Sequence, residues 1–86
     1  MHEASLMHNL MAHLLAAAAA RGARRIVAVR VQLGALSHMS AAHFHEHFVQ
    51  AAAGSIAEGA TIDALEQQDI QAASAADVVL VSFDIE

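Results

Sequence analysis

The sequence has no cysteine and no lysine among its 86 residues. The absence of cysteine excludes disulfides, zinc sites built from thiolates and cysteine nucleophiles. The fold must therefore be stabilised by packing. The length suits one domain with one modest core, which we expect to comprise residues 1–86.

Positive charge is also scarce, with four arginines against nine acidic residues and a formal net charge of -5. This balance argues against a nucleic-acid partner. Long apolar runs are missing too: none reaches the roughly 18 to 20 residues needed to cross a bilayer. Histidines and Glu3 interrupt the first apolar stretch, which differs from a signal peptide. We therefore expect a cytoplasmic protein with no membrane association.

The pattern of apolar residues predicts five elements. A helix is expected from Glu3 to about Ala20, ended by Arg21 and Gly22. Its apolar stripe has helical spacing and consists of Leu6, Leu10 and Leu14. A second helix, capped by Ser40, should run to about Ala53 with Phe44 and Phe48 buried. Strands are predicted at 26–33, 61–66 and 78–85.

These elements predict an α+β fold in the order α-β-α-β-β, with two helices packed on one face of a small three-stranded sheet, mixed or antiparallel. Strict alternation predicts which strand residues share a face. In the first strand these are Val27, Val29, Val31 and Leu33. In the last strand they are Val79, Val81, Phe83 and Ile85.

The first three residues, Met1, His2 and Glu3, form the leading candidate metal site. The amine of Met1, the deprotonated backbone nitrogen of His2 and its imidazole Nδ1 can chelate one ion in a plane. Ni²⁺ and Cu²⁺ favour such a tetragonal nitrogen environment, whereas Zn²⁺ prefers a tetrahedron. Glu3, water or another histidine could complete the set. The alternative is that His2 is an ordinary surface residue near a terminus.

The seven histidines include a second candidate, the cluster His43, His45 and His47. His43 and His47 stand four residues apart and could clamp a metal from one helix face. The sequence favours the other interpretation, an amphipathic helix whose histidines face water. His8 and His13 are expected on the surface, and His38 in a turn.

Catalytic signatures are lacking. The serines have no Gly-x-Ser-x-Gly context, the acidic residues have no spacing that forces a pair into a cleft, and the four glycines form no phosphate-binding motif. We therefore expect a protein that is not an enzyme.

Three segments, in order and with matching spacing, carry a resemblance to a known family. They are Met1-His2-Glu3-Ala4-Ser5-Leu6, Val29-Arg30-Val31-Gln32-Leu33-Gly34-Ala35-Leu36-Ser37 and Gly54-Ser55-Ile56-Ala57-Glu58-Gly59-Ala60. Together they resemble the HypA/HybF family of hydrogenase nickel incorporation proteins. The likeness extends to the last strand and so covers nearly the whole chain.

The resemblance implies a nickel metallochaperone for nickel-iron hydrogenase, and in some organisms urease. It implies that Ni²⁺ is bound at Met1, His2 and Glu3, with His2 as the essential ligand. It also implies a HypB-like GTPase and the hydrogenase large subunit as partners. The metal would move by ligand exchange rather than by catalysis.

The chain departs from the family at one point. Members carry a zinc domain with two cysteine pairs between their last two strands, but here the short stretch 67–77 stands in that place and no zinc is expected. We expect this stretch to be a linker that joins neighbouring antiparallel strands as a hairpin. An alternative function is a binding or oligomerisation module without metal delivery, and an exposed strand edge would favour a homodimer.

Overall fold

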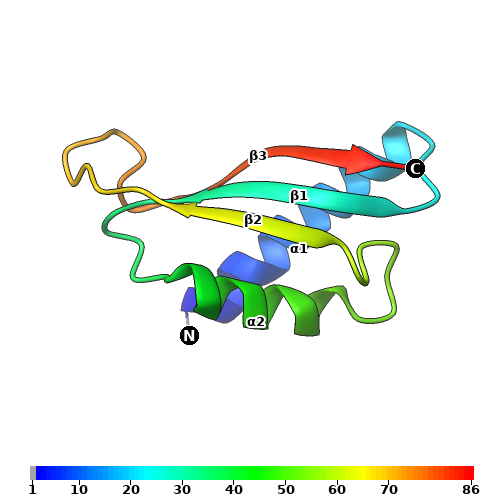
Figure 1. Cartoon of the computed structure of the whole chain (residues 1–86), viewed down its shortest axis with the longest axis horizontal. Coiled ribbons are helices and arrows are strands. Elements are labelled where there is room, and N and C mark those ends of the chain that lie inside the picture. Colours follow the sequence, from blue (N-terminus) through cyan, green and yellow to red (C-terminus); the bar gives the residue numbers. More distant parts are fainter. Residues whose placement is uncertain (1) are drawn as a thin grey trace.

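The computed structural model describes residues 2–86, with side chains from Ser5 onward. Its elements are α1 (His2–Ala20), β1 (Ile26–Leu33), α2 (Ala41–Ala52), β2 (Thr61–Glu66) and β3 (Val78–Ile85), shown in Figure 1. The predicted α+β class and element order are confirmed. All three strands have the predicted bounds, and each helix differs from its prediction by one residue.

The end of α1 is built by the residues that the sequence indicated. Gly22 adopts a positive φ of 71° just beyond the helix. The amide of Ala23 donates to the carbonyl of Ala18 at 3.1 Å, and that of Gly22 donates to Ala19 at 3.0 Å. This pair of bonds is the Schellman arrangement, which satisfies carbonyls that the helix leaves without partners.

The sheet is mixed and has the order β2-β1-β3. Strand β1 pairs with β2 in parallel and with β3 in antiparallel orientation, so it is central and the other two are edges. One core cluster joins alternate residues of β1 with apolar residues of both helices. Both helices therefore cover the same face of the sheet, and no described helix covers the other face, which we call the bare face (Figure 1).

The largest fully buried side chains belong to β1 and to the two helices that cover it. They are Phe44, Phe48, Leu14, Ile26, Leu33, Val29 and Val31. Phe44 and Phe48 of α2 lie with ring centroids 5.9 Å apart, one helical turn from each other. Their burial confirms the predicted inner face of the second helix.

The predicted strand faces are partly wrong because the ladder between β1 and β3 is irregular at two places. Pairing shifts between Ile26 and Ala28, and again between Arg30 and Val31, where Val81 is passed over. Each extra residue reverses the alternation beyond it. Ile26 therefore replaces Val27 as the buried residue, and Val81 is exposed. Val78 and Leu80, rather than Val79 and Val81, pack against the core.

The stretch 67–77 is not the predicted hairpin, since β2 and β3 are the two edges and β1 lies between them. It crosses the end of β1, projecting beyond the sheet in Figure 1. The amide of Gly34 donates to Asp77 at 2.8 Å, and that of Leu36 donates to Ala75 at 2.7 Å. A Cβ at Gly34 would collide with the carbonyl of Ala75, so glycine permits this close crossing.

Candidate metal-binding sites

The candidate nickel residues Met1, His2 and Glu3 fall at the edge of the described structure. Met1 lies outside the described residues, and of His2 and Glu3 only the backbone is described, as the first two residues of α1. The first four amides of a helix have no acceptor within that helix. The backbone nitrogen of His2, a proposed nickel donor, is therefore not required by the α1 hydrogen-bond ladder.

The second histidine cluster lies on α2, whose start is fixed by its cap. Ser40 has an extended backbone, and its hydroxyl accepts from the amide of His43 at 3.1 Å. This confirms the predicted capping role. The capped helix holds His43 and His47 one turn apart, and their Nε2 atoms approach to 2.8 Å. The two ring centroids are 4.5 Å apart, with the ring planes tilted by 46°.

The expectation that all three cluster histidines face water is wrong for two of them. His43 and His47 are half-buried, and His45 is exposed. The reason is helical geometry, because two residues span about 200° and place His45 on the other side from its neighbours. The i, i+4 spacing of His43 and His47 indicated that they share a helix face. The alternation with phenylalanine led to the wrong prediction that this face is fully exposed to water.

His47 also lines a shallow groove between the two helices. The remaining lining residues come from two turns of α1 and the following turn of α2, and are Met7, His8, Met11, Gln50 and Ala51. His8 is exposed, as expected. Within the described part of the chain no three or more His, Asp or Glu residues are grouped so that they could hold a metal ion.

A second groove runs between α1 and the beginning of β3. Apolar residues of both elements line it together with His13 and Asp77. His38 lines neither groove and lies in the turn between β1 and α2, with a positive φ of 60°. Its position confirms the predicted turn residue, and histidine is among the residues that tolerate this conformation.

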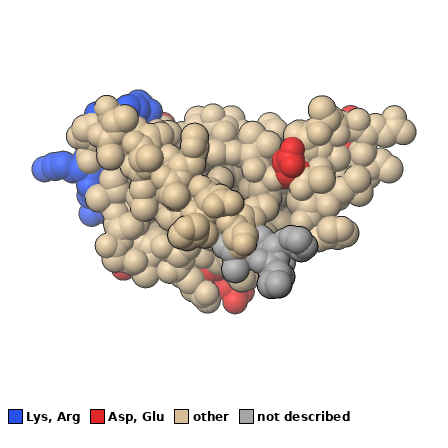
Figure 2. Space-filling view, turned by 180° about the vertical axis from the view of Figure 1, so that it is seen from behind, with Lys and Arg blue, Asp and Glu red and all other residues tan. Residues whose placement is uncertain are grey.

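Positive charge gathers at one end of the molecule, as the blue side chains in Figure 2 show. Arg21, Arg24 and Arg25 are exposed and follow α1 directly. The guanidinium of Arg21 lies 5.1 Å from the centroid of the Phe83 ring. A 19-residue helix is about 28 Å long, so the cationic cluster is remote from the first turn of α1.

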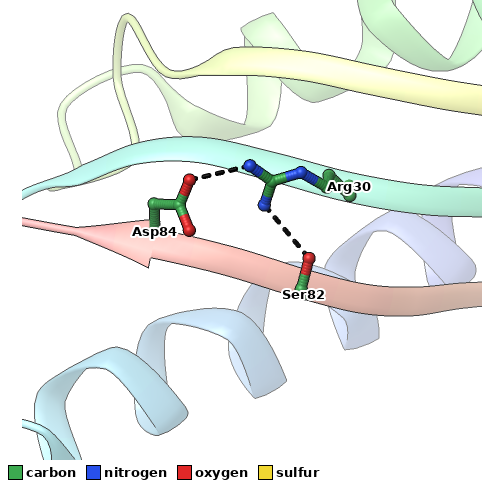
Figure 3. Close-up of polar contacts among 3 residues, drawn as sticks. All are labelled: Arg30, Ser82 and Asp84. Atoms are coloured by element: carbon green, nitrogen blue, oxygen red, sulfur yellow. Dashed lines mark hydrogen bonds and ion pairs between the residues drawn. The ribbon is translucent and has the colours of Figure 1, made fainter.

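The fourth arginine, Arg30, belongs to the bare face of the sheet (Figure 3). It donates to Asp84 at 2.8 Å and to Ser82 at 3.1 Å, both on β3. The hydrogen bond and the charge of Arg30 lower the pKa of Asp84, and the same contact raises the pKa of Arg30. This cross-strand cluster is an ordinary ion pair in contact with solvent, and it lies apart from both histidine groups.

Comparison with protein families gives a match to one family model over residues 1–75. Its description is hydrogenase/urease nickel incorporation, metallochaperone, HypA. The match covers most of the chain. It includes α1 and α2, and with them the helical residues that line the two grooves and the pair His43 and His47. The chain therefore belongs to the HypA family of metallochaperones, as its sequence motifs indicated. A comparison with curated proteins found no match.

Two further features bear on the class of protein. The chain has no cysteine, so a zinc site with four thiolate ligands cannot form in it. A search of the described helices found none long and apolar enough to span a membrane.

Proposed function

We propose that this chain, residues 1–86, is a single nickel-binding domain that carries Ni²⁺ for the maturation of nickel-iron hydrogenase, with urease as a further target. The observation that carries the proposal is the family match, which begins at Met1 and includes the Met1-His2-Glu3 start. Nickel is the cargo in this function, and the chain's task is to bind and release it.

The proposed ligands are Met1, His2 and Glu3. The Met1 amine, the His2 amide nitrogen and the His2 Nδ1 would form fused five- and six-membered chelate rings in one plane. Glu3 would supply the fourth donor. Three or four donors in a plane suit Ni²⁺ and disfavour Zn²⁺.

Two electrostatic effects act on a cation bound at Met1, His2 and Glu3, where α1 begins. The positive end of the helix dipole disfavours a cation by roughly 0.5 to 1 kcal/mol. Loss of the His2 amide proton and the charge of Glu3 supply compensating negative charge. Micromolar binding corresponds to about 8 kcal/mol, so the dipole term is the smaller effect. The distance from the arginine cluster exceeds the Debye length of about 8 Å, which removes a second source of repulsion.

Delivery would proceed by ligand exchange in the cytoplasm. A partner's donors would replace those of the chain one at a time, since a site at a chain end leaves one side of the ion open. The proposed partners are a HypB-like GTPase and the hydrogenase large subunit, by the family's role in nickel incorporation. No catalytic residue of this chain is needed for such a transfer.

The test is a calorimetric Ni²⁺ titration of protein that begins with the free amine of Met1. The same titration is run on His2→Ala and on a form extended by two residues before Met1, with absorbance followed for a square-planar band. We expect the band and one equivalent of tightly bound Ni²⁺ to disappear in both variants. Equal binding by all three proteins would refute the terminal site and favour a docking or oligomerisation role.

A further inference from the structure

Strand β3 forms one edge of the sheet (Figure 1). Among the described residues it pairs with β1 alone, so the backbone groups along its outer side can pair with a further strand. Its eight residues, Val78–Ile85, contain one charged side chain, Asp84, which forms an ion pair with Arg30. The side chain of Val81 is 54% exposed and adds apolar surface near the middle of the edge.

The groove between α1 and β3 adjoins this edge. Leu6 and Leu10 line it on α1, and Val78 and Leu80 line it on β3. If two β3 strands pair in antiparallel orientation, the two-fold axis is perpendicular to the sheet, and the helices of both copies lie on one face. The two α1 helices then face each other across the axis, so each copy covers the groove of the other.

The opposite edge, β2, is unsuited to the same pairing. Its six residues include Asp63 and Glu66, which are both exposed, and no positively charged residue. Two β2 strands side by side would bring these carboxylates together, and like charges across a strand pair are destabilising. Charge at an edge is a common protection against association. It is present on β2 and largely missing from β3.

Opposite charges stand at the two ends of β3. Asp77 precedes the strand and lines the groove, whereas the guanidinium of Arg21 lies 5.1 Å from the centroid of the Phe83 ring, near the end of the strand. A two-fold axis beside Leu80 sets Asp77 of each copy opposite Phe83 of the other, since both residues stand three positions from Leu80. Asp77 of each copy then approaches Arg21 of the other, and this contact occurs twice.

We propose that the β3 edge is an interface between two copies of this chain, which joins their sheets into one sheet of six strands. The surface is complementary to itself, with apolar residues at the axis and opposite charges on either side of it. The irregularity at Val81 permits the pairing, because three successive residues on each side of it pair regularly with β1. The interface involves none of the proposed nickel ligands.

The first test is analytical ultracentrifugation of the full chain over a range of concentrations, with a chelator present so that metal ions cannot bridge the copies. We expect a concentration-dependent species with twice the chain mass of 9.0 kDa. Val81→Lys should weaken the dimer about tenfold or more, because two added charges meet near the axis. The matched control is Leu65→Lys, since Leu65 is 57% exposed on β2, and it should leave association unchanged.

A charge exchange tests the contact between Asp77 and Arg21. Asp77→Arg and Arg21→Glu each bring like charges together and should each weaken the dimer, most strongly at low salt. An equimolar mixture of the two variants should associate again, because both contacts of the mixed dimer join opposite charges. Glu46→Arg makes the same change of charge on α2 and should have no effect.

Three results would overturn the interface. They are an unaltered protein that stays monomeric at millimolar concentration, a loss in Leu65→Lys as large as that in Val81→Lys, and no recovery of association in the mixture. Val81 and Leu65 are exposed, so both lysine variants should fold, which circular dichroism would verify. The measurements are made without metal, and their outcome is independent of the nickel titration.

Discussion

The two faces of the central strand β1 differ in what they contribute to the protein. On the covered face Val29, Val31 and Leu33 are at most 1% exposed beneath both helices. On the bare face Arg30 joins Ser82 and Asp84 in a cluster that remains in contact with water (Figure 3). Burial of apolar surface provides most of the folding free energy, and exposed ion pairs provide little. Stability is thus concentrated on one face, and the histidine pair His43 and His47 lies on α2, one of the two helices that cover it.

The difference in stability between the two faces is tested most strongly by Phe44→Ala. This substitution removes a fully buried ring from the core on the covered face. We expect a loss of about 3 to 5 kcal/mol in the free energy of unfolding, since both the transfer energy and the cavity contribute. For a small domain this approaches the total stability. Urea unfolding measures it, with His45→Ala as the exposed control on the same helix, expected to stay within about 0.5 kcal/mol. A Phe44→Ala loss as small as that of the control would contradict the proposed core.

A smaller effect is expected from Gly34→Ala at the end of β1, where the stretch 67–77 crosses. The new methyl group would meet the backbone carbonyl of Ala75. Overpacking of this kind costs about 1 to 3 kcal/mol, and thermal unfolding would measure it as a lowered Tm.

The cause of this loss can be tested by comparing the Tm of Gly34→Ala with that of the double variant Gly34→Ala, Ala75→Gly. Because the collision is with a carbonyl oxygen and not with the Ala75 side chain, removing that side chain should not restore stability. Recovery of the Tm in the double variant would show that the crossing is built differently.

The smallest effect is expected on the bare face, for Asp84→Asn. The pKa of Asp84 is lowered in the folded state by Arg30, so its ion pair stabilises the fold above the unfolded-state pKa of about 3.9. This contribution is lost as the pH falls through the lower folded-state pKa. The difference in stability between the original protein and Asp84→Asn should therefore be present at pH 7 and vanish in strong acid.

The matched control for that experiment is Asp63→Asn, because Asp63 lies opposite Arg30 on β2 and raises the pKa of Arg30 through charge alone. It should cost less than Asp84→Asn, which also removes a hydrogen bond. An equal cost for both variants, measured by urea unfolding at neutral pH, would show that the hydrogen bond contributes nothing beyond charge.

Local patterns predicted the elements well because their signals lie within a few residues. Gly22 after α1 and Ser40 before α2 satisfy backbone groups of their own helices, so neighbouring residues are sufficient to recognise them. The same reasoning failed for β3. Whether Leu80 or Val81 faces the core depends on an irregular pairing with β1, some fifty residues away in the chain, and alternation cannot reveal it.

The candidate sites divide in the same way. The proposed nickel site at Met1-His2-Glu3 was a prediction from the sequence alone, because its candidate donors are adjacent in the chain and chelation by them would require no folded partner. The family motifs give it a functional context that the match over residues 1–75 supports. The close pair of His43 and His47 was a possibility in the sequence, but its half-buried setting depends on how α2 packs against the rest of the molecule.

The sequence by itself determined the five elements, the absence of a thiolate zinc site and the HypA-like motifs, since each rests on residue types and short spacings. Only the tertiary structure decided the strand order β2-β1-β3, the two ladder irregularities and the crossing over Gly34. These features arise from contacts between residues distant in the chain. Their energies depend on which surfaces meet, and no local pattern records that.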